Sequence, residues 1–329
     1  MCCKRMLAMV LIAAGSVPAC LAAGEKAARP RADALPVIFD TDIGDDFDDT
    51  WALLMVVKSP QFDVKLVTTT CGKSEYRAKI IAKMLTVAGR TDIPIGLGEG
   101  GRGGSGGQQP WVKDYKLSDY PGKIYQDGAG AVIDTIKRSP RPVTVISIGP
   151  LHTMAKVLER EPQIATKASF AGMHGSVRKG YGGGSKIDAE YNVAANAPAA
   201  QKVLSAPWRQ ITITPVDTCA RVNVSGQRFQ ALKASRAPLV QALLENYRMW
   251  AGKKTVAELQ ASSTLFDTVA IYLANPGDKP LIGFEKLPIT VTKNGFTRID
   301  PKGKMMLVAT TWKDLDGFRD LLVKTLLAP

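Results

Sequence analysis

The chain has 329 residues, of which 45% are hydrophobic and 22% are charged, and its formal net charge is +13 at pH 7. This length and composition exclude intrinsic disorder as the main state and suit one large or two small domains. The basic residues are scattered instead of forming a tract with interleaved aromatics, so the charge indicates a solvated surface and not nucleic-acid binding.

The first residues have the pattern of a secretory signal peptide. Lys4 and Arg5 precede a short apolar run, MLAMVLIAAGSV, and the small residues of PACLAAG follow it. The run is too short to cross a bilayer, and no later segment is long and apolar enough to do so. We therefore expect a signal peptide over 1–23, a linker over 24–35 and a domain over 36–329. The protein would be exported, to the periplasm or by secretion.

The cysteines are consistent with export but do not define a disulfide framework. Cys20 follows Val-Pro-Ala, which weakly resembles a lipoprotein cleavage box, but a proline at that place is unusual. We therefore favour plain cleavage near Ala22 or Ala23 over lipid attachment through Cys20. Cys71 and Cys219 lie beyond the leader and allow one disulfide in an oxidising compartment, but no disulfide framework and no zinc ribbon.

Strand-like and helix-like segments alternate along the rest of the chain. In chain order we expect a strand over 36–39, a helix over 50–59, a strand over 64–70, a helix over 75–89, strands over 93–98 and 143–149, a helix over 151–161, a strand over 210–216, and two strands with a closing helix within 295–327. Because these strands are apolar on both faces, they predict a single large α/β domain with a mostly parallel central sheet flanked by helices.

The segment over 98–111 is rich in glycine and ends at Trp111. Such a composition is typical of an inert linker or of a mobile loop over a site. Trp111 can stack on a flat ligand or can be buried against the protein body, and the sequence leaves both alternatives open.

An acidic loop follows the first predicted strand. Within VIFDTDIGDDFDDTWALLM stand six aspartates: Asp40, Asp42, Asp45, Asp46, Asp48 and Asp49. Ligands of parallel sheets bind at the carboxyl ends of the strands, which is where this loop lies. Carboxylates this dense repel one another, and a hard cation such as Ca²⁺ or Mg²⁺ relieves the repulsion through oxygen ligands. Helix capping accounts for one or two of the six. The loop therefore predicts a cation site.

Two other acidic motifs fit less well. The twelve-position EF-hand pattern with its terminal Glu is absent. The DxDx[TV] opening of the haloacid dehalogenase phosphatases is nearly present, but Gly44 replaces the required Thr or Val. A Mg²⁺-dependent phosphatase of that type remains a less favoured alternative.

DTDIGDDFDDTWAL resembles the calcium-binding signature of the inosine-uridine nucleoside hydrolase family, in the branch with the longer DTDxGxDxDD motif. The segments VTTTCG, SIGPLHTMAKVLEREPQIA, FAGMHG with AEYNVAANAPAA, and LFDTVAIYLA resemble later segments of that family in the same order. The resemblance covers about residue 36 to the end of the chain. It implies that 36–329 is a nucleoside hydrolase-like catalytic domain.

The resemblance implies a reaction and a metal. The enzyme would hydrolyse the N-glycosidic bond of ribonucleosides, or of a related N-riboside, to ribose and free base with Ca²⁺ as cofactor. Asp42, Asp49, Asp267 and the backbone carbonyl of Ile148 would coordinate the ion. Asp42 would also take the proton from the metal-bound water that attacks the sugar.

The resemblance also implies how a nucleoside is held. Asp48 would bind a ribose hydroxyl, Glu190 and Asn192 would hold the sugar, and Met173 would lie against it. His174 and Trp111 are possible contacts or proton donors for the leaving base.

Three departures from the family pattern motivate an alternative. Phe266 stands where the family often has a His that protonates the leaving base. Lys73 and Gly184 replace two Asn residues that contact the sugar. The alternative is a catalytically weak or inactive exported protein that binds a nucleoside or a sugar. The resemblance further implies a homodimer or a homotetramer.

Overall fold

The structure is a computed structural model and describes residues 30–101 and 106–328. The predicted signal peptide over 1–23, with Cys20, and the linker up to residue 29 lie outside the described residues. Among the helices of the described part, none is long and apolar enough to cross a membrane.

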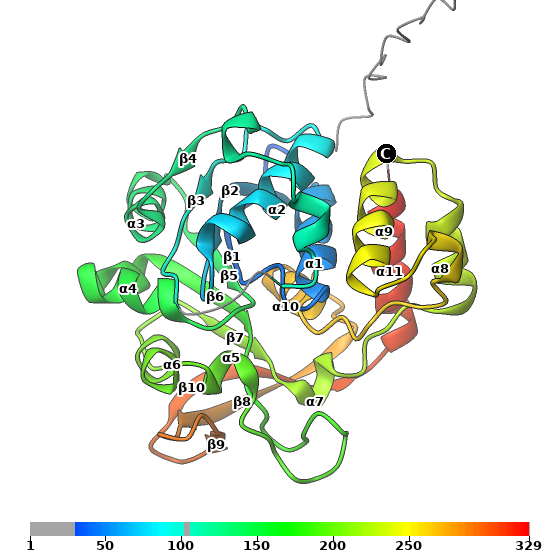
Figure 1. The fold of residues 1–329 in the computed structure, drawn as a ribbon. Coiled ribbons are helices and arrows are strands. Elements are labelled where there is room, and N and C mark those ends of the chain that lie inside the picture. The colour runs from blue at the N-terminus through cyan, green and yellow to red at the C-terminus, as the bar shows by residue number, and fades with distance from the viewer. Residues whose placement is uncertain (1–29, 102–105, 329) are drawn as a thin grey trace, which may run out of the picture.

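The described residues contain one ten-stranded sheet (Figure 1). Its strands are β1 (Leu35–Thr41), β2 (Phe62–Thr69), β3 (Ile95–Gly96), β4 (Ile124–Tyr125), β5 (Val143–Ser147), β6 (Ala168–Met173), β7 (Ile211–Thr214), β8 (Ile282–Val291), β9 (Thr297–Ile299) and β10 (Lys304–Trp312). The order across the sheet is β4-β3-β2-β1-β5-β6-β7-β10-β8-β9. Neighbours from β4 to β10 are parallel, whereas β8 is antiparallel to both β10 and β9.

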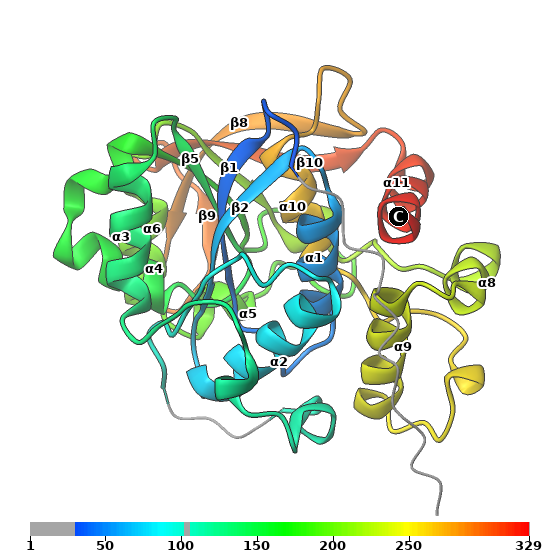
Figure 2. The ribbon, with the colours of Figure 1, turned by 90° about the horizontal axis from the view of Figure 1, so that it is seen from above.

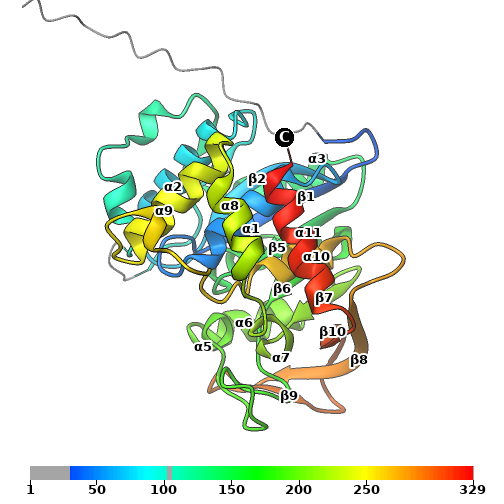
Figure 3. The ribbon, with the colours of Figure 1, turned by 90° about the vertical axis from the view of Figure 1, so that its right-hand side faces the viewer.

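Helices cover both faces of this sheet. They are α1 (Asp48–Lys58), α2 (Ser74–Val87), α3 (Gly128–Arg138), α4 (His152–Arg160), α5 (Tyr191–Ala194), α6 (Ala197–Leu204), α7 (Val216–Cys219), α8 (Gly226–Ala234), α9 (Pro238–Trp250), α10 (Thr268–Ala274) and α11 (Leu315–Leu327). Seen along the sheet, α3, α4 and α6 lie on one face and α1, α2 and α10 on the other (Figure 2). An outer group of α8, α9 and α11 packs on the second face, in front of α1 and α2 (Figure 3).

Strand β1 shows why a continuous apolar run forms a central strand. Its side chains alternate between the two faces, so Val37 and Phe39 join the core under α1 and α2 while Ile38 joins the core under α3 and α4. All three are fully buried. A strand with helices on both faces has no polar side, which is why its sequence shows no alternation.

The strand order places a crevice beside β1. The chain moves outward from β1 through β2, β3 and β4, and then returns to add β5 on the other side of β1. The loops that follow β1 and β5 therefore leave the sheet in different directions. Ligands of open α/β sheets bind at such a switch point, beyond the carboxyl ends of the strands.

The predicted α/β fold class is confirmed, and several elements are more complex than expected. The strand over 93–98 pairs only at Ile95–Gly96. No individual range was predicted for the strands β4, β6 and β8 or for the helices α3, α5, α6, α7, α8, α9 and α10. The predicted helix over 75–89 ends as expected, because Gly89 adopts a positive φ of 64° just beyond it. The possible disulfide does not form, since Cys71 and Cys219 are both free.

Candidate functional site

A cavity of about 490 Å³ opens at the carboxyl ends of β1, β5 and β6. Its described lining residues are Asp42, Asp45, Asp46, Asp48, Asp49, Ile148, Met173, Tyr181, Glu190, Tyr191, Asn192, Phe266 and Asp267. Eight of the ten residues to which the sequence assigned site roles are in this lining. Strand β1 delivers Asp42, β5 delivers Ile148, β6 delivers Met173, and the starts of α1, α5 and α10 supply the others.

Three carboxylates meet at the floor of the cavity. Asp48, Asp49 and Asp267 each offer an oxygen, and these oxygens lie within 4.8 Å of one another. All three side chains are buried. Asp48 and Asp49 form the first turn of α1, whereas Asp267 immediately precedes α10. Helix α10 packs against both α1 and β6, and this packing brings Asp267 to the acidic loop.

Burial and mutual repulsion raise the pKa values of these acids. Burial raises the pKa of Asp49 well above its usual range, and the charges of Asp42 and Asp48 raise it further. Burial followed by the charges of Asp48, Asp49 and Asp42 does the same for Asp267. The pKa of Asp48 rises to about 6, mainly through burial. A bound cation favours the ionised form of such carboxylates, because its charge offsets the cost of burial and their mutual repulsion.

The donor set therefore fits a hard divalent cation. It consists of carboxylate oxygens, and Ca²⁺ and Mg²⁺ prefer oxygen ligands. Ile148 lines the same cavity. The sequence included Asp42 in the ligand set and assigned Asp48 to the sugar. In the structure Asp48 is part of the close group of three, and Asp42 lies beside them in the same cavity.

Asp42 is held in a buried position next to this cluster. Its exposed fraction is 7%, and burial raises its pKa to about 7 while the charge of Arg77 lowers it. Asp45 and Asp46 also line the cavity, but their side chains are exposed. Asp45 and Asp46 thus lie toward solvent, and the paired Asp48 and Asp49 lie at the floor.

The opposite wall carries Glu190 and Asn192. The Glu190 carboxylate accepts hydrogen bonds from the backbone amides of Gly175 at 2.8 Å and Asn192 at 2.7 Å, which fixes it at the start of α5. The Asn192 amide donates to the carbonyls of Ile148 at 2.8 Å and Met173 at 3.1 Å. Asn192 therefore ties together the ends of β5 and β6 at the cavity.

Aromatic side chains form the outer part of the cavity. Tyr181 and Phe266 meet edge to face with their ring centroids 5.9 Å apart, and the Tyr181 hydroxyl accepts from the Tyr191 amide at 3.1 Å. Tyr181 and Tyr191 are 43% and 54% exposed, so they offer apolar surface to a ligand. The sequence reading missed both. Tyr191 stands inside the AEYN segment, whereas nothing in the sequence marked Tyr181.

Two of the assigned residues lie away from the described lining. His174 is fully buried, its Nε2 is 3.2 Å from the Gly149 carbonyl, and burial lowers its pKa to about 4. Trp111 is 7% exposed in the 3₁₀ helix Gln109–Val112, where the Lys83 ammonium lies 4.2 Å from its ring centroid. Of the two alternatives for Trp111, the structure shows burial against the protein body.

The departures from the family pattern also separate in space. Phe266 lines the cavity. Lys73 is exposed before α2 and borders a different depression of about 380 Å³. Gly184 lies in an exposed loop, and nothing is within 4 Å of the place where its Cβ would be.

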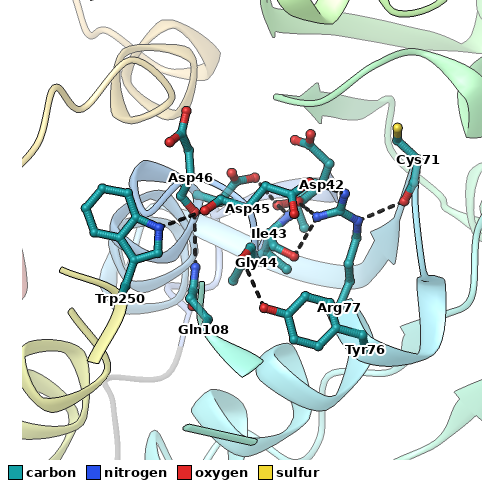
Figure 4. Close-up of polar contacts among 12 residues, drawn as sticks. Asp42, Ile43, Gly44, Asp45, Asp46, Cys71, Tyr76, Arg77, Gln108 and Trp250 are labelled. Atoms are coloured by element: carbon teal, nitrogen blue, oxygen red, sulfur yellow. Dashed lines mark hydrogen bonds and ion pairs between the residues drawn. The ribbon is translucent and has the colours of Figure 1, made fainter. Parts of the chain in front are cut away.

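A set of donors that sequence reasoning missed holds the acidic loop from below (Figure 4). The Trp250 indole donates to the Asp45 carbonyl at 2.7 Å and the Gln108 amide donates to the Asp46 carbonyl at 3.1 Å. The Tyr76 hydroxyl donates to the Gly44 carbonyl at 3.0 Å. These donors come from three separate parts of the chain, so no local sequence motif predicts their contacts with the acidic loop.

Known proteins resemble this chain over most of its length. The family profile described as "Inosine-uridine preferring nucleoside hydrolase" matches residues 37–318. The pyrimidine-specific ribonucleoside hydrolase RihA of Salmonella newport (strain SL254) is 26% identical over 233 residues, which are 64% of this chain and 71% of that protein. RihA of Escherichia coli O7:K1 is 27% identical over 233 residues, with the same shares covered.

Solved structures show the same fold. The plant nucleoside hydrolase PpNRh1 superimposes with a TM-score of 0.75 at 22% identity, covering 90% of this chain and 99% of that one. The inosine-uridine preferring nucleoside hydrolase of Bacillus anthracis has a TM-score of 0.70 at 16% identity, with 90% and 100% covered. The chain therefore belongs to the inosine-uridine preferring nucleoside hydrolase family, and it is an enzyme that hydrolyses N-glycosidic bonds.

Proposed function

We propose that this protein is a Ca²⁺-dependent ribonucleoside hydrolase in which Asp42 accepts the proton of the attacking water. One observation carries the proposal: the buried carboxylates of Asp48, Asp49 and Asp267 converge at the floor of a cavity that Asp42 also lines. Asp49 and Asp267, with Asp42 and the Ile148 carbonyl, would hold the ion. When bound, Ca²⁺ would orient a water and the sugar hydroxyls and lower the pKa of that water.

The remaining residues suit a ribose. Hydrolysis of an N-glycosidic bond develops positive charge on the sugar ring, and fixed carboxylates near the ring stabilise that charge. Asp48 and Glu190 are such carboxylates, and backbone amides hold Glu190 in place. The Asn192 amide and Met173 complete the sugar side. The exposed rings of Tyr181 and Tyr191, together with Phe266, suit the flat face of a base.

The test is a reducing-sugar assay over purine and pyrimidine ribonucleosides, with Ca²⁺ and with a chelator. We expect release that requires Ca²⁺ and that falls about 10²- to 10⁴-fold in Asp42→Asn, as for loss of a general base. Asp217→Asn is the matched control, because Asp217 is a buried aspartate outside the cavity lining. Release in the chelator at the full rate would exclude the Ca²⁺ mechanism.

A second candidate is binding without turnover. Phe266 favours it, because it lines the cavity where the family often has a proton-donating His. Tight nucleoside binding by calorimetry with no sugar released from any member of the panel would support this candidate. Steady release that Asp42→Asn abolishes would exclude it.

We further propose that the chain is exported and loses residues 1–23. The pattern of the first residues supports this proposal. Mass spectrometry of the mature protein would give its first residue, and an intact chain that begins at Met1 in the cytoplasmic fraction would refute export.

We also propose a homodimer or a homotetramer, as the family resemblance implies, and light scattering of the purified protein would distinguish these from a monomer.

A further inference from the structure

The guanidinium of Arg77 lies beneath the acidic loop and joins it to the loop that precedes α2 (Figure 4). One of its terminal nitrogens donates to the carbonyls of Asp42 and Ile43, the second of these at 2.9 Å. The other terminal nitrogen donates to the Asp45 carboxylate at 2.8 Å, and Nε donates to the Cys71 carbonyl at 2.8 Å. The guanidinium therefore bonds to the backbone carbonyls on both sides of the Ile43 Cα atom.

The surrounding backbone is shaped to admit this side chain. Arg77 is only 2% exposed, although its carboxylate partner Asp45 lies at the rim. A Cβ at Gly72 would come within 2.8 Å of the guanidinium, and Gly72 adopts a positive φ of 60°. The preceding Cys71 also has a positive φ, of 58°, which is costly for a residue with a side chain. The loop before α2 thus adopts an uncommon conformation, and Arg77 bonds the Cys71 carbonyl within it.

Charge alone does not account for the position of Arg77. A buried cation beside a cation site repels the ion that the site binds, so it weakens the site unless it supplies something else. Three of the four groups it bonds through side-chain nitrogens are backbone carbonyls, namely those of Asp42, Ile43 and Cys71. Directional bonds to carbonyls fix backbone orientation, and the fourth partner, Asp45, offsets the charge.

We propose that Arg77 is a positioning residue that fixes the backbone of Asp42, so that the Asp42 carboxylate faces the cation and the sugar. Asp45 anchors the guanidinium and acts through it. The proposal rests on the Ca²⁺-dependent function proposed above. Residues that orient metal ligands from outside the ligand shell commonly change affinity or activity by about 10- to 100-fold when they are replaced.

The molecule offers a matched control just beyond the far end of α2. Arg90, beyond the opposite end of α2, is also a buried arginine, and it is paired with the exposed Asp92 at 2.9 Å. Neither residue is in the cavity lining. Arg90→Lys therefore removes a buried guanidinium of similar burial and pairing, and it leaves the contacts of the acidic loop unchanged.

The experiment is a calorimetric Ca²⁺ titration of the full chain, with thermal unfolding and the sugar-release assay on the same samples, for Arg77→Lys, Arg77→Met and Arg90→Lys. We expect both Arg77 variants to bind Ca²⁺ about 10-fold or more weakly and to lose a similar factor in kcat. We expect Arg90→Lys to lower Tm while Ca²⁺ affinity and kcat stay at the wild-type values.

Three outcomes would overturn the proposal. Tighter Ca²⁺ binding by Arg77→Met would mean that Arg77 acts by charge alone. Wild-type affinity and kcat in Arg77→Lys would mean that the directional bonds are not needed. A loss in Arg90→Lys equal to that in the Arg77 variants would mean a general effect on the fold.

A wild-type protein that binds no Ca²⁺ would instead contradict the proposed function. Hydrogen exchange of the acidic loop then tests Arg77 independently. Faster exchange over 42–48 in Arg77→Lys and not in Arg90→Lys would support its positioning role, and unchanged exchange would overturn it.

Discussion

At the scale of single residues, the site depends on carboxylates kept close together in spite of their repulsion. Asp267 shows this most clearly, because its pKa is raised well above its usual value by burial and then by the charges of Asp48, Asp49 and Asp42. The charge of Asp48 is the largest contribution to this pKa after burial. Without a cation, the ionised form of Asp267 is therefore disfavoured.

This gives a prediction for Asp267→Asn. Burial and three neighbouring carboxylates disfavour the ionised form of Asp267, so Tm in chelator should stay equal to or rise above that of the wild type when a neutral amide replaces this carboxyl. The rise in Tm on adding Ca²⁺ should disappear, because a ligand that binds only the folded state stabilises it by an amount that grows with its affinity. Thermal unfolding with chelator and with Ca²⁺ measures both effects.

Asp217→Asn is the control for that measurement. Asp217 is buried and accepts from the amides of Val177 at 2.9 Å and Arg178 at 2.7 Å, outside the cavity lining. Its replacement should lower Tm and keep the Ca²⁺ response. If Asp267→Asn retained the full response, Asp267 would not be a ligand.

At the scale of elements, the junction between β1 and α1 is the part of the fold on which the site depends most. Gly44 lies in this junction with a φ of 125°, and a Cβ there would come within 2.6 Å of the Tyr76 ring. The Tyr76 hydroxyl also bonds the Gly44 carbonyl. The tight approach of α2 to the loop thus requires a glycine at position 44, for its φ and for the space.

We therefore predict that Gly44→Ala destabilises the protein by about 1–3 kcal/mol through backbone strain, with a further contribution from the contact with Tyr76. Nucleoside hydrolysis should fall as well, since the same loop carries Asp42. Urea unfolding and the sugar-release assay measure the two effects. Gly182→Ala is the control, because nothing lies within 4 Å of its Cβ position, and its effect should stay within about 0.5 kcal/mol. Equal effects of the two substitutions would contradict the argument.

At the scale of the whole molecule, buried acids make stability depend on pH. Burial raises the pKa of Asp40, Asp42 and Glu190 to about 7 each. Because these values lie above those of the unfolded chain, the folded state holds its protons to higher pH, and stability is lost as pH rises through about 7. His174 acts in the opposite direction, since its pKa is lowered from 6.5 to about 4, but only below about 6.5.

Above pH 6.5, the change of stability with pH therefore reports on the buried acids and not on His174. In chelator, the free energy of unfolding should fall by about 1–2 kcal/mol between pH 6.5 and about pH 8. Saturating Ca²⁺ should reduce this fall, because the ion stabilises the ionised carboxylates. Urea unfolding at both pH values, with and without Ca²⁺, is the measurement. A free energy that rises over this range in chelator would contradict the burial of these acids.

The amino-acid sequence by itself determined the parallel core and most of the site. A short apolar run such as β1 is typical of a strand covered on both faces, and acids that follow such a strand lie at a carboxyl end of the sheet. This reasoning placed Asp42, Asp48 and Asp49 together, because they are neighbours in one loop. The order of later segments, through the family resemblance, added Ile148, Glu190, Asn192 and Asp267.

Only the tertiary structure decided what depends on contacts between distant segments. Asp267 reaches the acidic loop because α10 packs on α1 and β6, and Arg77 reaches the same loop from α2. The sequence could not show that Trp111 packs into the body or that Tyr181 faces the cavity, since an aromatic side chain suits either environment. Local patterns record what a segment buries, but the partner that it meets is set by how the layers pack.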